Sequence, residues 1–292
     1  MTAAIARFWI ALIHFSAHLS LRVRRSIAAV IGELACLVVV RRRRIAQANL
    51  RACFPAMTTG QRRALIRRLF RNMARGALDY GVLWTGSRQA VQDFVRVEGM
   101  EHLLHQDNYP LIMLAPHFVG LDAGGIRIAS ELKAVSIYAR QSNPVWDHWL
   151  QLGRARFNEP VLIARRHADL RGALRAMRAG LPFYYLPDMD NGDSNSIFVP
   201  FFGVPAATLP MVSRLARNIG AKVVMTVTEQ TPDGYVLHVE APWQDFPGDS
   251  VEQDTARMNR EIERWVLRMP DQYLWTHRRF KTRPEGAARL YG

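Results

Sequence analysis

The sequence contains only two cysteines, Cys36 and Cys53, among its 292 residues. Two thiols supply neither a disulfide framework nor a plausible zinc ligand set, and they fit a reducing compartment. The chain also has no GxxxxGK phosphate loop and no GxSxG nucleophile elbow. These absences argue against ATP binding and against a covalent intermediate on an elbow serine. With 15 prolines and 49% hydrophobic residues, the composition is that of an ordered globular protein.

Acidic residues are scarce in the first quarter of the chain. Residues 1–75 contain fifteen arginines, no lysine and a single acid, Glu33, which gives this segment a net charge of +14. The whole chain also carries +14, so residues 76–292 are neutral overall. A nucleic-acid enzyme more often spreads its basic residues around the active-site cleft. A basic, apolar amino-terminal region on a neutral body instead indicates docking on a membrane, and we expect no nucleic-acid partner.

Long hydrophobic runs are missing from this region as well. Phe8–Leu21 and Ile27–Val40 are mostly apolar, but each falls short of the roughly 20 residues that a transmembrane helix needs. Arg22, Arg24 and Arg25 lie between the two runs, and placing three arginines in hydrocarbon is costly. We therefore predict that this segment associates with membrane lipids, whose anionic head groups the arginines would meet. Both a single span and peripheral anchoring stay open.

From about Val95 onward, short apolar runs alternate with stretches of helical periodicity, which predicts an α/β sheet with helices on its faces. The predicted fold is a single catalytic domain with a central mixed sheet at 91–292, preceded by a membrane-associated helical segment at 1–90. Strands are expected at Leu111–Ala115, Ala134–Ala139, Val161–Ala164, Phe183–Leu186, Val223–Thr228 and Tyr235–Val239. Helices are expected at Leu121–Leu132, Pro144–Phe157, Leu170–Ala179, Leu209–Ile219 and Gln253–Arg268.

The stretch Leu111–Arg127, LIMLAPHFVGLDAGGIR, is the strongest candidate for chemistry. His117 comes just after the predicted strand Leu111–Ala115, where open α/β sheets place their ligand sites. Asp122 follows five residues later, and such a pair can act as acid and base on a hydroxyl group. Between them, Gly120 would let a substrate or another backbone approach closely.

The spacing alone does not single out this pair, because His102 and Asp107 repeat it. The two contexts differ. His102 lies in a polar helical stretch beside Glu101, which predicts a solvated surface residue. His117 instead follows a buried strand, so we favour it as the functional histidine.

Charged residues follow three other predicted strands. Arg140 comes after AVSIYA, Arg165 after VLIA and Asp188 after FYYLP, with Arg166 and Asp190 close by. The carboxyl ends of parallel strands meet at one edge of a sheet, so these side chains are candidates for a shared binding site. Each of them alone is also compatible with an ordinary surface loop.

Three phenylalanines follow this region, and they have two interpretations. Phe198, Phe201 and Phe202 could line a slot for an acyl chain. Aromatic residues at such spacing are also common in an ordinary core. The sequence leaves both interpretations open.

Longer motifs, spread over nearly the whole chain, resemble the late acyltransferases of lipid A biosynthesis, the lauroyl and myristoyl transferases of the lysophospholipid acyltransferase superfamily. They are NLRACFP (49–55), VEGMEHL (97–103), APHFVGLDAGG (115–125), ARQSNPVWDHWLQLGRAR (139–156), YYLPDMDNGDSNSIFVPFFGVPAAT (184–208), DGYVLHVEAP (233–242) and MNREIERWVLRMPDQYLWTHRRFKTRP (258–284). Motifs of this length in this order are far more specific than the His-x-x-x-x-Asp spacing.

The resemblance implies a direct acyl transfer without a cofactor, a metal or a covalent intermediate. His117 would be the general base, and Asp122 would orient it. The acceptor would be the hydroxyl of a 3-hydroxyacyl chain on a Kdo-bearing lipid A precursor, and the donor an acyl thioester of acyl carrier protein. Arg140 and Arg165 would bind phosphates or sugar carboxylates of the acceptor.

The same resemblance implies a position at the cytoplasmic face of the cell inner membrane, among its lipids. Part of the basic amino-terminal surface would dock the acidic acyl carrier protein. A lysophospholipid or an amino-acid lipid is the alternative acceptor. The segment QYLWTHRRFKTRP at 272–284 favours the lipid A acyltransferases over this alternative.

Overall fold

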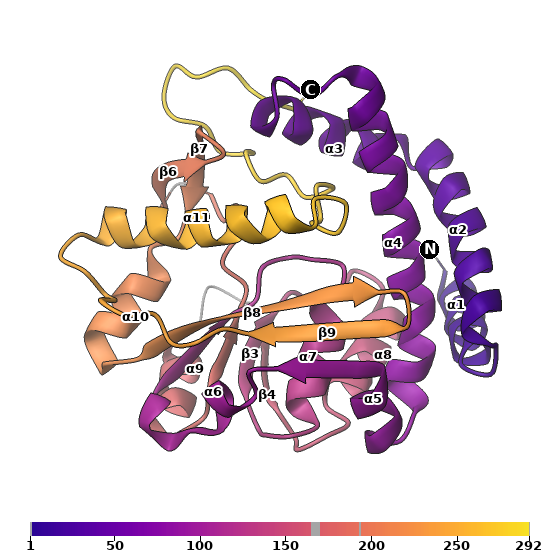
Figure 1. Ribbon diagram of the computed structural model, residues 1–292, viewed down its shortest axis with the longest axis horizontal. Coiled ribbons are helices and arrows are strands. Elements are labelled where there is room, and N and C mark those ends of the chain that lie inside the picture. Colours follow the sequence, from indigo (N-terminus) through magenta and orange to yellow (C-terminus); the bar gives the residue numbers. More distant parts are fainter. Residues whose placement is uncertain (1, 165–169, 193, 292) are drawn as a thin grey trace.

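The computed structural model describes residues 2–164, 170–192 and 194–291 as a mixed sheet with helices on both faces (Figure 1). The sheet order is β1-β9-β8-β2-β5-β3-β4. Strands β8 and β9 run antiparallel, and the other neighbouring strands run parallel. Their bounds are β1 Val95–Glu98, β2 Leu111–Leu114, β3 Val135–Tyr138, β4 Val161–Ala164, β5 Phe183–Tyr185, β8 Lys222–Thr231 and β9 Gly234–Val239. The predicted α/β fold with a central mixed sheet is confirmed.

Strand β2 shows why its sequence is apolar without interruption. Ile112 and Leu114 belong to one hydrophobic cluster, and Leu111 and Met113 belong to a second. Successive side chains of a strand point to opposite faces. A strand that helices cover on both sides therefore needs an apolar residue at every position, which is the pattern that identified it in the sequence.

Helices cover the two faces of the sheet separately. Residues of α9, α10 and α11 belong to the cluster of Ile112, residues of α5, α7 and α8 belong to the cluster of Leu111, and α4 contributes to both. The bounds are α5 Arg88–Phe94, α6 Glu101–Leu104, α7 Leu121–Ala129, α8 Pro144–Arg154, α9 Leu170–Arg178, α10 Met211–Ile219 and α11 Val251–Arg268, with a 3₁₀ turn at Gln106–Asn108.

The hairpin of β6 (Ile197–Phe201) and β7 (Val204–Thr208) forms a separate two-stranded sheet. It was not predicted, and neither was β1. Pro200 and Pro205 face each other in the hairpin register. Because proline has no N–H to donate to a neighbouring strand, its presence argues against predicting a strand from the sequence.

Four helices form the amino-terminal region: α1 Ala3–Ser16, α2 Leu21–Val38, α3 Val40–Cys53 and α4 Thr59–Thr85. Helices α1 and α2 pack along α4 (Figure 1). Glycines permit the close approach: a Cβ on Gly32 would lie 2.5 Å from the Arg71 Cα, and one on Gly81 would lie 2.4 Å from the Ile13 carbonyl oxygen. The described residues before β1 are thus mostly helical, and α4 joins the core of the α/β body.

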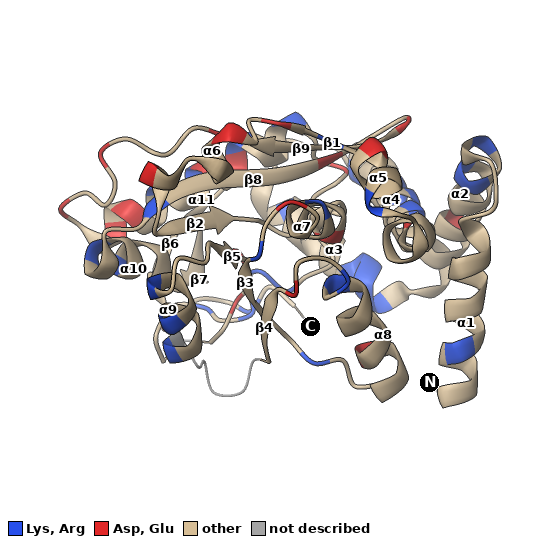
Figure 2. Ribbon diagram, turned by 90° about the horizontal axis from the view of Figure 1, so that it is seen from below, with Lys and Arg blue, Asp and Glu red and all other residues tan. Residues whose placement is uncertain are grey.

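The outer surface of α1 and α2 is apolar. Phe8 is 61% exposed and Leu37 is 64% exposed. The large exposed hydrophobic residues are Ile5, Phe8, Trp9, Leu12 and Phe15 on α1, and Val23, Ile27, Val30, Leu34, Leu37 and Val38 on α2. Figure 2 shows basic residues along α2 and α4 beside this surface, and in these two helices all of them are arginines. Within the described part of the chain, no helix is both long enough and apolar enough to cross a membrane.

Candidate active site

Two of the predicted strand-end residues, His117 and Asp188, meet directly. They follow β2 and β5, which are adjacent parallel strands with Leu114 opposite Tyr185. The His117 Nδ1 lies 2.7 Å from the Asp188 Oδ1, and the His117 backbone N–H donates to the Asp188 Oδ2 at 3.0 Å. The carboxyl edge of the parallel strands therefore carries a histidine–carboxylate pair, as open α/β sheets place their sites.

The carboxylate in this pair differs from the predicted one. Asp122 lies in the first turn of α7 and accepts hydrogen bonds from the Arg154 Nε at 2.8 Å and from the Tyr80 hydroxyl at 2.5 Å. The turn after His117 thus aims Asp122 towards α4 and α8, and its hydrogen bonds go to these helices rather than to the His117 ring. Burial disfavours the Asp122 carboxylate, but Arg154, Tyr80 and His117 together outweigh burial and lower the pKa of Asp122.

The contact with Asp188 determines which nitrogen of a neutral His117 ring carries the proton. Asp188 is 2% exposed, and burial works against its charge. The positive charge of His117 and its two hydrogen bonds outweigh burial, so the pKa of Asp188 lies well below its ordinary value. A carboxylate only accepts, so a neutral His117 donates from Nδ1. This tautomer follows from the hydrogen-bond geometry, and it leaves the Nε2 lone pair available to take a proton.

The carboxyl-terminal segment 272–277 closes one side of the pair. Its Leu274 N–H donates to the His117 carbonyl oxygen at 2.9 Å, and Tyr273 bridges to Phe118. Burial, followed by the charge of Asp188 and a hydrogen bond with it, raises the pKa of Tyr273 well above its ordinary value. Tyr273 is therefore a neutral neighbour of the Asp188 carboxylate.

A second histidine, His277, stands beside the first, with the two ring centroids 4.9 Å apart at an interplanar angle of 72°. Burial and then the charge of His117 lower the pKa of His277 to about 4. Helix α3 holds this segment in place: the Asn49 Nδ2 donates to the Trp275 and His277 carbonyl oxygens at 2.7 Å each, and the Arg42 Nη1 donates to the Thr276 carbonyl oxygen at 3.1 Å. The sequence reading did not identify Tyr273 or His277, although both lie in the motif QYLWTHRRFKTRP.

Other predicted site residues do not join the pair. Arg140 follows β3 with an exposed side chain. Asp190 accepts from the Thr282 N–H at 2.6 Å and from the Thr282 hydroxyl at 2.8 Å. Arg165 and its neighbour Arg166 lie outside the described residues. The predicted strand ends therefore do share one sheet edge, but of the predicted site residues that the structure describes there, only His117 and Asp188 are in contact.

The remaining candidates have packing roles in the structure. A Cβ on Gly120 would lie 2.5 Å from the Thr228 carbonyl oxygen, so the close approach there is to the backbone of β8. Phe201 is fully buried beside Tyr273 and Phe280. This is the ordinary-core interpretation, and it leaves Phe201 no surface in a slot.

Phe202, the next residue, is partly exposed. It has a positive φ of 49° and packs on Phe54 with ring centroids 4.8 Å apart. Its N–H donates to the Glu263 Oε1 at 2.7 Å. Phe202 thus keeps some surface that a ligand could contact, whereas Phe201 does not.

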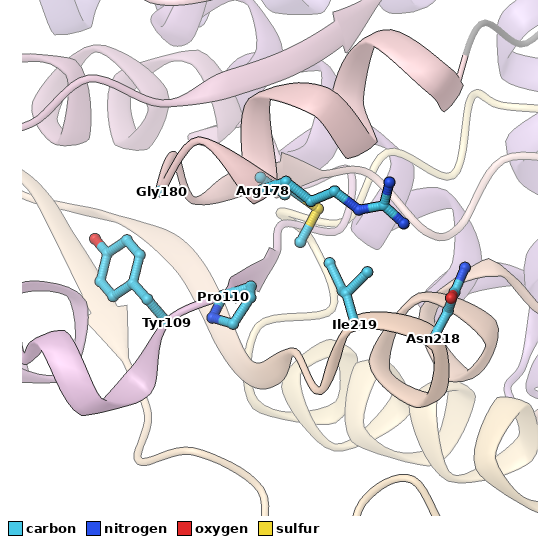
Figure 3. A pocket seen from close by; sticks show the side chains of 7 residues that line it. Tyr109, Pro110, Arg178, Gly180, Asn218 and Ile219 are labelled. Atoms are coloured by element: carbon cyan, nitrogen blue, oxygen red, sulfur yellow. The ribbon is translucent and has the colours of Figure 1, made fainter.

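Two cavities lie away from this pair. One of about 460 Å³ is lined by Pro110, Gly180 and Ile219, together with Tyr109, Met177, Arg178 and Asn218 (Figure 3). Pro110, Gly180 and Ile219 come shortly before β2, β5 and β8, so this cavity opens at the amino ends of strands whose carboxyl edge holds His117. The other, of about 670 Å³, lies before β3 and β4, between Glu131 and Glu159. Neither cavity is lined by a predicted site residue.

The fold is an α/β sheet that holds a histidine–carboxylate pair at the carboxyl edge of its parallel strands. The family of bacterial lipid A biosynthesis acyltransferases matches residues 2–282. The chain belongs to this family and is an acyltransferase of lipid A biosynthesis.

Three relatives from Escherichia coli (strain K12) illustrate the similarity. The lipid A biosynthesis lauroyltransferase is 35% identical over 267 residues, which cover 89% of this chain and 86% of the relative. The palmitoleoyltransferase is 33% identical with the same coverage. The myristoyltransferase is 29% identical and covers 92% of this chain and 84% of the relative.

Proposed function

We propose that the protein transfers a fatty acyl chain from acyl carrier protein to the hydroxyl of a 3-hydroxyacyl chain on a Kdo-bearing lipid A precursor. The observation that carries this proposal is the contact of the His117 Nδ1 with the buried Asp188 carboxylate. This contact leaves the His117 Nε2 available as a base for a substrate hydroxyl, so the reaction needs no nucleophilic side chain of the protein. The names of the relatives support the lipid acceptor, and their different acyl groups leave the chain length of this enzyme open.

In this mechanism the acceptor hydroxyl oxygen attacks the thioester carbonyl carbon while the His117 Nε2 takes the hydroxyl proton. The resulting oxyanion collapses, the C–S bond breaks, and the imidazolium returns the proton to the leaving thiolate. Asp188 orients the ring and stabilises its positive charge, as the carboxylate of a catalytic triad does. Asp122 adds negative charge nearby: its carboxylate and His117 interact electrostatically.

Acceptor binding extends the proposal to the remaining residues. Arg140 and Arg165 would bind the phosphates or sugar carboxylates of the acceptor in bidentate fashion. Phe202 would contact an acyl chain through its partly exposed ring. Gly120 would act only through its backbone, since Thr228 occupies the space beside it.

We further propose that residues 1–90 dock the enzyme on the cytoplasmic face of the inner membrane. The apolar surface of α1 and α2 would enter the interface, and neighbouring arginines would meet anionic head groups. Residues 91–292 would carry the chemistry. Because Asn49 and Arg42 of α3 bind the segment beside His117, the docked helices are also in contact with the reacting site.

The experiment is an acyl-transfer assay with purified protein, an acyl thioester of acyl carrier protein and a tetraacylated Kdo-bearing precursor. A lysophospholipid is offered in parallel as the alternative acceptor. We expect transfer to the lipid A precursor only. Transfer to the lysophospholipid alone would refute the proposed acceptor, and an absolute preference for an acyl-coenzyme A thioester would refute the proposed donor.

A further inference from the structure

A second cluster of charges lies where α2, α4 and the hairpin of β8 and β9 meet (Figure 1). At its centre Asp79 is fully buried. The Arg25 Nη1 lies 3.0 Å and 2.8 Å from its two carboxylate oxygens, and the Arg24 Nε lies 3.0 Å from Oδ1. The Arg75 Nε lies 3.7 Å from Oδ2, and the Tyr235 hydroxyl donates to Oδ2 at 2.8 Å.

Positive charge is in excess in this cluster. Three guanidinium groups carry three positive charges, and Asp79 is the one carboxylate that pairs with them among the residues described. Burial and then mutual repulsion with Arg25 lower the pKa of Arg75, and burial lowers the pKa of Arg24. An arginine nonetheless stays charged in a protein. The cluster therefore holds about two uncompensated positive charges.

Hydrogen-bond donors are unused in the same place. Of the buried guanidinium atoms that find no acceptor in the described part of the chain, four lie in this cluster: the Nε of Arg24, Arg25 and Arg75, and the Nη2 of Arg25. The Arg24 Nε is close to Asp79, but its N–H does not point at the carboxylate. Arg24 itself is only 4% exposed. Buried polar groups normally have a partner, so these donors indicate that a ligand belongs in the cluster.

Two aromatic contacts offset part of this cost. The Arg24 guanidinium lies 5.3 Å from the Phe94 ring centroid, and that of Arg75 lies 5.8 Å from the Tyr235 ring centroid. The Arg75 Nη2 also donates to the Gly234 carbonyl oxygen at 3.0 Å. These contacts use ring faces and one terminal nitrogen, so they leave the four buried donors without an acceptor.

We propose that Arg24, Arg25 and Arg75 bind a phosphate group. A phosphate monoester carries about −1.5 to −2 charges near neutral pH and has three acceptor oxygens, which matches both the excess charge and the unused donors. Guanidinium groups bind phosphate in bidentate fashion. Exposed Val23 and Ile27 lie on the same turns of α2, so the phosphate can come from a lipid head group whose chains follow this apolar surface, or from a soluble phosphate.

The test measures the midpoint of thermal unfolding with and without inorganic phosphate at constant ionic strength. For the wild-type protein we expect a rise of about 3 °C at ten times the dissociation constant. Arg25→Gln, which removes two of the unused donors, should abolish the rise. Arg22→Gln, an exposed arginine one turn away on α2, is the matched control and should keep it.

A second arm identifies the source of the phosphate. Flotation of the protein with phosphatidylcholine vesicles, with and without phosphatidic acid, should show binding that Arg25→Gln weakens. Arg214→Gln, which changes an exposed arginine of α10 outside residues 1–90, is the control in this arm and should leave the binding unchanged. Binding in this arm alone assigns the site to a lipid head group, and a thermal shift alone assigns it to a soluble phosphate.

If Arg25→Gln does not fold, Arg25→Lys keeps the charge but loses the fork geometry, and it should show a reduced shift. Equal responses of the wild type and the Arg25 variant in both arms would overturn the proposal. No acyl transfer enters either arm, so the result is independent of the proposed catalytic function.

Discussion

Asp188→Asn removes the carboxylate that holds the proposed base while it keeps the size of the side chain. In the wild type a positive charge on His117 would lie 2.7 Å from the Asp188 Oδ1. At an effective dielectric constant of 20 this pair is worth about 6 kcal/mol, which is an upper bound because the amide oxygen still accepts a hydrogen bond. General-base catalysis contributes about 10²- to 10⁴-fold. We therefore expect kcat to fall about 10²- to 10⁴-fold with a much smaller change in KM.

The assay is initial-rate acyl transfer with both substrates varied, beside a urea unfolding curve to show that the variant is folded. Asp107→Asn is the matched control, because it removes the acid of the other His-x-x-x-x-Asp pair, and it should leave kcat unchanged. The reasoning fails if Asp188→Asn keeps more than a tenth of the wild-type kcat while Asp122→Asn abolishes transfer. That outcome would return the orienting role to Asp122.

Three further predictions concern stability and docking. Burial lowers the pKa of His277 to about 4 in the folded protein, whereas its pKa in the unfolded chain is near 6.5. The free energy of unfolding should therefore fall by up to about 3 kcal/mol as the pH falls from about 6.5 to about 4. Urea unfolding at several pH values measures this change, and His277→Gln should make the free energy of unfolding less dependent on pH in this range. Gly32→Ala forces a Cβ to 2.5 Å from a Cα of α4 and should lower the stability by about 1–3 kcal/mol. Gly60→Ala, where the nearest atom is 3.9 Å away, is the control and should be neutral or stabilising. Equal changes in the calorimetric stability of the two variants would contradict the packing described. Val30→Glu with Leu34→Glu, both on the exposed apolar surface, should weaken vesicle flotation without changing the unfolding midpoint, and unchanged flotation would argue against docking through α2.

The sheet could be predicted because its strands have a simple cause. Leu111–Leu114 is buried on both faces and is apolar throughout, so composition alone reveals it. The hairpin at 197–208 could not be predicted in this way, because two prolines interrupt its pattern. Strand β1 also escaped, since Val95–Glu98 alternates with charged residues and is only four residues long.

The site could be predicted only in part, for a physical reason. Strand order decides which ends become neighbours, and the sequence does not reveal that β5 lies beside β2. His117 and Asp188 were both candidates, but spacing along the chain favoured Asp122 as the partner. Tyr273 and His277 reach the pair from the far end of the chain, through contacts that no local pattern encodes.

The most direct test of the account is single-turnover transfer by His117→Ala, with an acyl thioester of acyl carrier protein and the Kdo-bearing lipid A precursor, and His102→Ala as control. The account predicts at least about a 10²-fold slower turnover for His117→Ala, a wild-type rate for His102→Ala, and no acylated protein by intact mass in any sample. Wild-type turnover by His117→Ala, or an acyl group trapped on the protein, would contradict it.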